Sequence, residues 1–390
     1  MASETLENTS RILADLVGFP TISAESNLEM IAYASEILSA LGARLSVTLD
    51  ESGRKANLFA TLGPDGDGGI VLSGHSDVVP VDGQEWTSDP FALRRANGNL
   101  YGRGTCDMKG FIACCLAMAP QFAEFDLKRP LHFAFTYDEE VGCFGARALV
   151  EELERAEIRP SVSIIGEPTM MRIIEGHKGC FEYTTEFRGL AGHASGPERG
   201  VNAVEYAVRY ISRLMAIAEE LKSRAPHGNR FDPPWTTLQV GTISGGAARN
   251  VIADHCSVEW EMRPVRNEDA DFVKDRIHAY AETELKPAMR AVFEGSDIVT
   301  HVIGEVDGLE PVSESEARRT VSELTGLTEA EVVAFGTEAG LFQKAGISSV
   351  ICGPGSIEQA HKADEFVAID QLDECLAMLE RLGRRMSLER

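Results

Sequence analysis

Alternating apolar and polar stretches divide this chain into short strand-like runs and longer helix-like runs. Over residues 3–18, Leu6, Leu13, Leu16 and Val17 recur at helical spacing and fall on one face. Strand-like and helix-like runs then alternate, with strands at 57–63, 69–75, 131–137 and 162–166 and helices at 109–123 and 143–156. This alternation predicts an α/β fold with a largely parallel sheet and helices on both of its faces.

The pattern changes near residue 178 and changes back near residue 306. Between them it predicts strands at 180–189, 235–246, 255–264 and 297–305 and helices at 201–222 and 268–284. The order βαββαβ is typical of a compact two-layer α+β unit. The α/β pattern then returns, with strands at 331–335 and 348–352 and a helix at 370–386. We therefore predict a discontinuous α/β domain over 1–177 and 306–390, with an α+β domain inserted at 178–305.

Length and charge agree with this division and narrow the partners. The 390 residues exceed the roughly 250–300 at which a single hydrophobic core stops growing. The net charge of -24 comes from 61 acidic and 37 basic residues. Such a surface repels nucleic acid and anionic membranes, so we expect neither as a partner. The simplest interpretation of the charge is solubility.

Cysteine usage and the N-terminal segment bear on the compartment. The eight cysteines form no C-x-x-C pair and suggest no disulfide framework, which favours a reducing environment. The first residues lack the basic start and apolar core of a secretory signal. No apolar stretch reaches the 18 residues that would suggest a membrane-spanning helix. We expect a cytoplasmic protein.

Three of the apolar runs stop at side chains that bind metals. IVLSGHSD (70–77) ends with His75 and Asp77, LHFAFTYDEE (131–140) with Glu139 and Glu140, and VSIIGEP (162–168) with Glu167. In open α/β sheets, ligands gather at the carboxyl ends of the strands. Charged side chains at three such ends would repel one another without a positive charge among them. A metal site is therefore the leading hypothesis.

Each of these residues alone also has a simpler interpretation. Asp77 is spaced to accept a hydrogen bond from the second ring nitrogen of His75, but the pair is also compatible with a core histidine beside a surface aspartate. Asp107, in YGRGTCDMKG (101–110), is equally a candidate helix N-cap, and this segment lacks the order of a phosphate-binding loop. Glu139 and Glu140 are either a solvated turn or two carboxylates with separate tasks, one on metal and one on protons.

The number of candidates favours the metal hypothesis. Two imidazoles and three carboxylates come from His75, Asp107, Glu140, Glu167 and His361. Nitrogen and oxygen ligands without a thiolate suit zinc, with cobalt and manganese as alternatives. Five ligands exceed what one tetrahedral ion requires. They suit two divalent ions bridged by one carboxylate, about 3.5–4 Å apart as in two-metal hydrolases.

The chain resembles the M20 family of dinuclear metallohydrolases from its N-terminus to its last helix. The resemblance rests on SGHSDVVPVDGQEW, LYGRGTCDMKGFIA, TYDEEVGC, IGEP, GHKG, AGHAS and GPGSIEQAHKADEF. It implies that His75, Asp107 and Glu167 hold one zinc ion. It further implies that Asp107, Glu140 and His361 hold the second, with Asp107 bridging the two.

The resemblance also implies roles for other residues and for the inserted domain. Glu139 would be the general base, and Asp77 would orient His75. The inserted domain would be a lid that forms a homodimer. Cys106 stands where many relatives carry alanine before the bridging aspartate, so either an oxidisable thiol or a small buried residue lies beside the predicted metal site.

Four residues outside the metal motifs are candidates for contact with the substrate. By resemblance, His193 in RGLAGHAS would stabilise the oxyanion in the partner subunit's site, although alone it is only a loop histidine. Asn250 and Arg263 match positions that relatives use near the substrate, and an arginine can bind an α-carboxylate through two hydrogen bonds. Glu338, in FGTEAG, is a candidate partner for a substrate ammonium group.

The activity implied by the resemblance is metal-dependent hydrolysis of a linear amide. The favoured reaction removes the acetyl group from N2-acetyl-L-ornithine and yields L-ornithine and acetate. Another N-acylated amino acid or a short dipeptide remains open as the substrate, because metal motifs serve the amide and not the side chain. A non-catalytic binding protein of the same fold is a third hypothesis, which the full ligand set together with Glu139 opposes.

Overall fold

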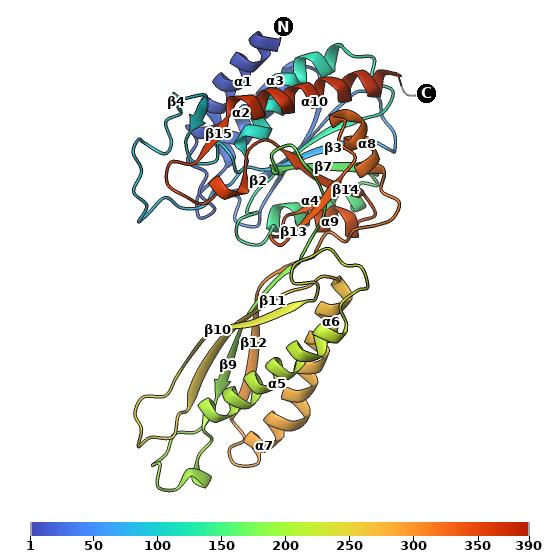
Figure 1. Ribbon diagram of the computed structural model, residues 1–390. Coiled ribbons are helices and arrows are strands. Elements are labelled where there is room, and N and C mark those ends of the chain that lie inside the picture. The colour runs from blue at the N-terminus through green and yellow to red at the C-terminus, as the bar shows by residue number, and fades with distance from the viewer. Residues whose placement is uncertain (1, 389–390) are drawn as a thin grey trace. The chain divides into compact units, whose positions relative to one another are not determined.

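The structure is a computed structural model that describes residues 2–388, in which the chain folds into two units (Figure 1). Unit 1 comprises residues 1–176, 311–332 and 337–390, and unit 2 comprises residues 177–310 and 333–336. The predicted α/β class with an inserted α+β part is confirmed. Within the described residues, no helix is both long enough and apolar enough to cross a membrane.

Unit 1 is built on an eight-stranded sheet in the order β1-β2-β6-β3-β7-β14-β8-β13. The strands are β1 (Arg44–Leu49), β2 (Ala56–Leu62), β3 (Ile70–His75), β6 (Leu131–Thr136), β7 (Val162–Pro168), β8 (Ile173–His177), β13 (Ala330–Val333) and β14 (Ser348–Gly353). A small separate sheet contains β4 (Arg94–Ala96), β5 (Asn99–Tyr101) and β15 (Phe366–Ala368). The central strands β6, β3, β7 and β14 are parallel.

Helices cover both faces of the large sheet, as predicted (Figure 1). On one face lie α1 (Ala2–Val17), α2 (Leu28–Ala40), α3 (Lys109–Glu124), α8 (Glu316–Thr325) and α10 (Ile369–Leu388). On the other lie α4 (Phe144–Arg155) and α9 (Ala339–Lys344). Because β3, β6 and β7 are covered on both faces, every residue in them is buried. This burial explains why these strands are continuous apolar runs without alternation.

The sheet is less parallel than the sequence pattern predicted. Strand β2 pairs antiparallel with both β1 and β6, and β8 pairs antiparallel with β14. A strand's apolar pattern reports burial and not direction, so the pattern could not distinguish these pairings. Several elements were also not predicted, namely α2, β1, β4, β5, β8, α7, α8, α9 and β15.

Unit 2 follows the predicted order βαββαβ around its own apolar core. Its four-stranded antiparallel sheet has the order β10-β11-β9-β12. The strands are β9 (Cys180–Arg188), β10 (Thr237–Gly245), β11 (His255–Arg263) and β12 (Asp297–Val306). The helices are α5 (Ala203–Ser223), α6 (Asn267–Tyr280) and α7 (Lys286–Arg290), with a π-helical turn at Ala281–Leu285 between the last two.

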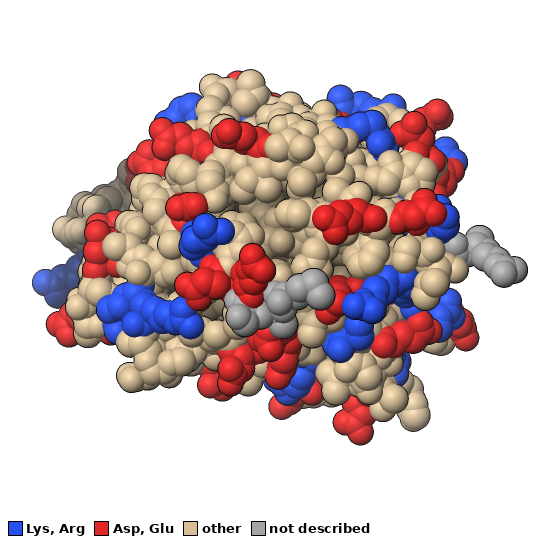
Figure 2. All heavy atoms as spheres, turned by 90° about the horizontal axis from the view of Figure 1, so that it is seen from above, with Lys and Arg blue, Asp and Glu red and all other residues tan. Residues whose placement is uncertain are grey.

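Charged side chains of both signs are interspersed on the face of the molecule seen in Figure 2. Acidic residues outnumber basic ones in the sequence, 61 to 37. Interspersed charges of this kind favour solubility and do not by themselves indicate a binding site.

Candidate metal centre

The residues predicted to bind metal converge at one edge of the unit 1 sheet. Strand β6 is parallel to β3 in a register that places Thr136 beside His75, and β7 is parallel to β3 on its other side. His75 is the last residue of β3, and Glu167 lies at the end of β7. Because parallel strands end at the same edge, these two side chains and the turn after β6 meet there.

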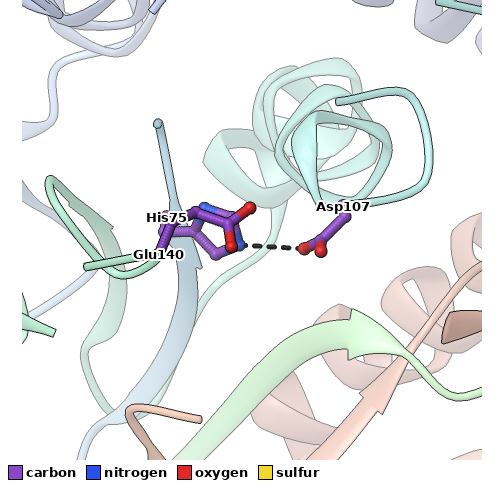
Figure 3. Close-up of side chains that lie close together, drawn as sticks. All are labelled: His75, Asp107 and Glu140. Atoms are coloured by element: carbon purple, nitrogen blue, oxygen red, sulfur yellow. Dashed lines mark hydrogen bonds and ion pairs between the residues drawn. The ribbon is translucent and has the colours of Figure 1, made fainter. Parts of the chain in front are cut away.

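The Asp107 carboxylate lies between two imidazoles. Its Oδ1 is 3.0 Å from Nε2 of His75, and its Oδ2 is 3.4 Å from Nε2 of His361. Figure 3 shows His75 and Asp107 approaching each other from β3 and from the loop before α3. Glu167 Oε1 lies 3.7 Å from Nε2 of His75, and Glu140 Oε2 lies 3.0 Å from Nε2 of His361. Asp107 therefore belongs to two donor groups at once, one through each oxygen.

These separations fit a pair of divalent ions. Ligand atoms at about 2.0–2.2 Å from a tetrahedral zinc ion lie roughly 3.4 Å from one another. Donor atoms of His75, Asp107 and Glu140 all lie within 4.8 Å of one another, as do those of His75, Glu139 and Glu167. Cys106 contributes no donor, because its thiol is directed at the carbonyl of Ser356, 3.2 Å away. The donor set is thus imidazole and carboxylate, which suits zinc, cobalt or manganese.

Electrostatics give a second reason to expect cations here. Burial and the neighbouring Asp107 raise the pKa of Glu167 well above its usual value, and burial raises the pKa of Glu139 to about 8. Burial and Asp107 also raise the pKa of Glu140. Buried carboxylates this close to one another disfavour ionisation unless positive charge is present. A divalent ion would supply that charge and return these groups to their ionised form.

Asp77 lies beside His75, and its predicted role in orienting that imidazole stays a prediction. Nδ1 of His75 is 2.9 Å from the main-chain carbonyl of Asp77 and 3.6 Å from its carboxylate. The Asp77 carboxylate also accepts hydrogen bonds from the main-chain N–H groups of Glu139 and Glu140, at 3.0 and 3.3 Å.

Glu139 and Glu140 lie in a turn beyond β6, not on the strand itself, which ends at Thr136. The turn is held from outside, because Nζ of Lys55 is 2.6 Å from each carboxylate oxygen of Asp138. Sequence reasoning missed this support, since nothing in the pattern links a lysine before β2 to a turn after β6. Asp107 is not a helix N-cap either, because α3 begins at Lys109 after Met108.

Two of the predicted substrate-contact residues lie together in unit 2. His193 forms an isolated β-bridge with Val251, and the main-chain N–H of Ala194 donates to the carbonyl of Asn250 at 3.1 Å. The main-chain N–H of Ser195 donates to Nδ1 of His193 at 3.2 Å. Nδ1 of His193 also lies 2.7 Å from the hydroxyl of Ser195, and the imidazole is exposed.

The other two candidates already have partners within their own units. Arg263 is at the end of β11 in unit 2 and pairs with Glu261 at 2.9 Å. Glu338 lies in unit 1, is 1% exposed, and accepts hydrogen bonds from the hydroxyls of Ser73 and Thr136. Each oxygen of Glu338 keeps a second lone pair, so burial and not hydrogen bonding limits the access of a substrate ammonium group.

Comparisons with known sequences agree with the metal centre. The model of the family described as peptidase family M20/M25/M40 matches residues 71–385. The acetylornithine deacetylase of Pasteurella multocida (strain Pm70) is 35% identical over 374 residues, which cover 94% of this chain and 95% of that protein. The acetylornithine deacetylase of Myxococcus xanthus is 37% identical over 388 residues, which cover 97% of each.

Solved structures share the fold at lower sequence identity. An M20 family metallo-carboxypeptidase from Sulfolobus solfataricus superposes with a TM-score of 0.72 at 20% identity, covering 97% of this chain and 98% of that one. The YXEP protein of Bacillus subtilis, described as a dinuclear metal-binding peptidase of the M20 family, superposes with a TM-score of 0.65 at 17% identity, covering 98% of each chain. At these identities the likeness shows the fold alone.

Metal binding should release protons. Hydrogen bonds to Asp107 and Glu140 raise the pKa of His361 to about 10. For His75, burial lowers the pKa, but hydrogen bonds to Asp107 and Asp77 raise it well above its usual value. The raised pKa values favour the doubly protonated, charged form of both imidazoles in the metal-free protein. Ligation requires neutral imidazoles and ionised carboxylates, so we expect at least two protons to leave and the apparent affinity to rise with pH up to about 10.

Calorimetric titration with zinc in buffers of different ionisation enthalpy measures this release. His361→Ala should lower it by about one proton. His193→Ala alters an exposed histidine of unit 2 and should leave the release unchanged. Proton uptake, or release that is equal in all three proteins, would contradict the assignment of His361 as a ligand.

Proposed function

This chain belongs to peptidase family M20/M25/M40, and on that premise we propose that it removes the acetyl group from N2-acetyl-L-ornithine, giving L-ornithine and acetate. The observation that carries the reaction is the Asp107 carboxylate between two imidazoles, with Glu139 in the adjoining turn. The observation that favours this substrate is identity of 34–37% to acetylornithine deacetylases over at least 90% of the chain. Arginine synthesis is the metabolic context that this activity implies.

Two divalent ions, most simply zinc, complete the proposed site. His75, Asp107 and Glu167 would hold one ion, and Asp107, Glu140 and His361 would hold the other. Distances between donor atoms within these two groups support the assignment. When bound, such a pair lowers the pKa of a water molecule to about 7 and polarises the acyl carbonyl. Cobalt and manganese accept the same ligands.

Glu139 is the proposed proton carrier. The main-chain N–H of Glu139 donates to Asp77, which fixes the position of the turn. The Glu139 carboxylate lies beside the donor atoms of His75 and Glu167. Burial raises its pKa in the metal-free protein, and bound cations would lower that pKa again, so the carboxylate would be ionised and able to accept a proton in the metal-loaded site. Glu139 would accept a proton from the attacking water and deliver it to the α-amine as the amide bond breaks. The same carboxyl group thus serves both halves of the reaction.

Unit 2 supplies the proposed contacts to the rest of the substrate. His193 is exposed, and an imidazole N–H can donate to a developing oxyanion. Arg263 would exchange its pairing with Glu261 for the α-carboxylate of the substrate. Asn250, whose main chain is bonded to the His193 segment, would add a polar contact beside it.

We further propose that the protein works as a homodimer in the cytoplasm. His193 is exposed, and the contacts of its Nδ1 are with Ser195 of its own segment, so the imidazole is accessible to a second subunit. Apolar side chains on α5 are unusually exposed, with Val208 at 51% and Met215 at 63%. Helix α5 packs beside β10, an edge strand that exposes Ile243. An exposed apolar helix face beside an edge strand is typical of an interface.

Replacing Glu139 should separate metal binding from turnover. Glu139→Ala should keep two bound ions but lose about 10²–10⁴-fold in kcat, because proton transfer loses its carrier. Acetate release and metal content of the purified variant provide the measurements. The control is Glu151→Ala, which removes an exposed carboxylate of α4 and should leave kcat unchanged. Near-normal kcat with metal bound would show that another group carries the proton.

A substrate panel tests the proposed specificity. We expect the highest kcat/KM for N-acetylornithine when it is compared with the acetylated forms of citrulline, glutamate, methionine and diaminobutyrate. Removing a single charged contact changes such a ratio by about tenfold or more. A preference for another member would show that the protein is a deacylase or dipeptidase of the same family with a different substrate. No acetate release from any member, with metal bound, would favour a binding protein of this fold.

Mixing two inactive variants tests the proposed sharing of His193 between subunits. In a mixed dimer of His193→Ala and Glu139→Ala, one site keeps its own Glu139 and receives His193 from the partner. Random exchange makes about half of the dimers mixed, and each mixed dimer has one complete site out of two. Activity should therefore recover to about one quarter of wild type. Mixing His75→Ala with Glu139→Ala leaves neither site complete and should give no recovery. Absence of recovery in both mixtures, despite proven exchange, would place His193 outside the partner's site.

A further inference from the structure

A buried glutamate behind the candidate metal centre joins two of its residues. Glu365 is 1% exposed and lies four residues after His361. One carboxylate oxygen accepts hydrogen bonds from the main-chain N–H groups of Cys106 and Asp107, at 2.9 and 3.1 Å. The other accepts from the N–H of Gly104 at 3.0 Å. Glu365 thus fixes the main chain of the loop that carries Asp107.

Arg103 extends this contact toward the segment of His361. It is 1% exposed, and its Nη1 donates to Glu365 at 2.8 Å and to the carbonyl of Lys362 at 3.2 Å. Its Nη2 donates to Oε1 of Gln84 at 2.5 Å. The buried carboxylate is therefore paired with a guanidinium, which is the arrangement that makes a buried charge tolerable.

Gln84 completes the connection. Its amide Nε2 donates to the main-chain carbonyl of His361 at 2.9 Å, while its Oε1 accepts from Arg103 and from Trp86 Nε1 at 3.1 Å. His361 has a φ of 62°, in the left-handed region that non-glycine residues seldom adopt. A main chain in that region persists where its surroundings hold it. The amide of Gln84 is one such restraint.

We propose that Gln84, Arg103 and Glu365 are positioning residues that fix the main chain of His361 relative to Asp107, and so set the affinity of the ion shared by Asp107, Glu140 and His361. This inference rests on the proposed two-ion site. The side-chain hydrogen bonds described for these three residues lead to the loop of Asp107 and to the segment of His361, and not to His75 or Glu167. Glu365 holds Asp107, which both ions would share, whereas the amide of Gln84 donates only to the main chain of His361, so loss of that amide should affect the ion held by His361.

The decisive variant is Gln84→Glu, because it removes the hydrogen bond to His361 and keeps the one from Arg103. The carboxylate retains an acceptor for Arg103 but cannot donate to the His361 carbonyl. An added negative charge near the site by itself strengthens cation binding. A loss of affinity therefore cannot come from charge and reports the lost hydrogen bond. Glu365→Gln is less suitable alone, because it leaves Arg103 buried without a charged partner.

Stepwise zinc and cobalt titration of the metal-free protein gives the readout. We expect one binding step of Gln84→Glu to weaken by about tenfold, the scale seen when outer partners of metal ligands are removed, with the other step unchanged. Cobalt absorption identifies which site is affected. Gln359→Glu places the same charge two residues from His361 without touching that hydrogen bond, and it should not weaken either step. Thermal denaturation of both metal-free variants should match wild type.

Two unchanged steps, or two steps weakened equally, would overturn the proposal. Wild-type protein that binds fewer than two ions would overturn it together with the two-ion site. Wild-type protein that binds two ions but releases no acetate from N-acetylornithine would contradict the proposed function only. In that case the selective loss in Gln84→Glu would still stand as evidence for positioning, because titration does not depend on turnover.

Discussion

Repulsion among buried carboxylates is the constraint on which this site depends. Asp107, Glu139, Glu140 and Glu167 meet at one sheet edge, where burial and mutual proximity raise the pKa of the three glutamates. An arrangement that opposes its own ionisation is stable only with positive charge supplied, either as protons or as cations. The two imidazoles beside Asp107 can either carry that positive charge as bound protons or act as ligands to cations that carry it. Metal affinity and proton binding are thus two outcomes of one electrostatic arrangement.

The fold brings these groups together by using strand ends and by fixing the loops beyond them. His75 and Glu167 need no further restraint than the hydrogen bonds of β3 and β7. Glu139 and Glu140 lie in a turn, and Asp77 and Lys55 hold that turn from either side. His361 and Asp107 come from loops, so no sheet hydrogen bonds fix their main chains. The buried hydrogen bonds of Gln84, Arg103 and Glu365 are proposed to fix them instead. Precision at a metal site therefore extends well into the surrounding polar contacts.

The sequence revealed those features that repeat or that serve burial. Continuous apolar runs predicted β3, β6 and β7 because both of their faces are covered, and periodicity predicted the long helices α3, α5 and α10. Strand β1 was missed because it is largely exposed, and α9 because six residues are too few to show a helical period. The antiparallel pairing of β2 was missed because an apolar run looks the same whether the strand is parallel or antiparallel to its neighbour.

Individual contacts within the site were harder to predict than its members. His75, Glu140 and Glu167 could be named because they follow apolar runs, and Asp107 and His361 because they lie in loop motifs that complete the ligand count. The partner of Nδ1 of His75 could not, since a main-chain carbonyl at 2.9 Å is invisible in the sequence. The environment of Glu338 was likewise hidden, because Ser73 and Thr136 are distant in sequence and reach it only through the packing of α9 against the sheet.

The division of labour between the two units explains why the reaction is easier to assign than the substrate. The proposed metal ligands and Glu139 lie in unit 1, and the distances between them are internal to that unit. His193, proposed to act on the oxyanion, lies in unit 2, as do Asn250 and Arg263, which are proposed to contact the rest of the substrate, and Arg263 already has an acidic partner. Substrate binding must therefore compete with a contact internal to unit 2. In the proposed function, specificity would depend on that competition.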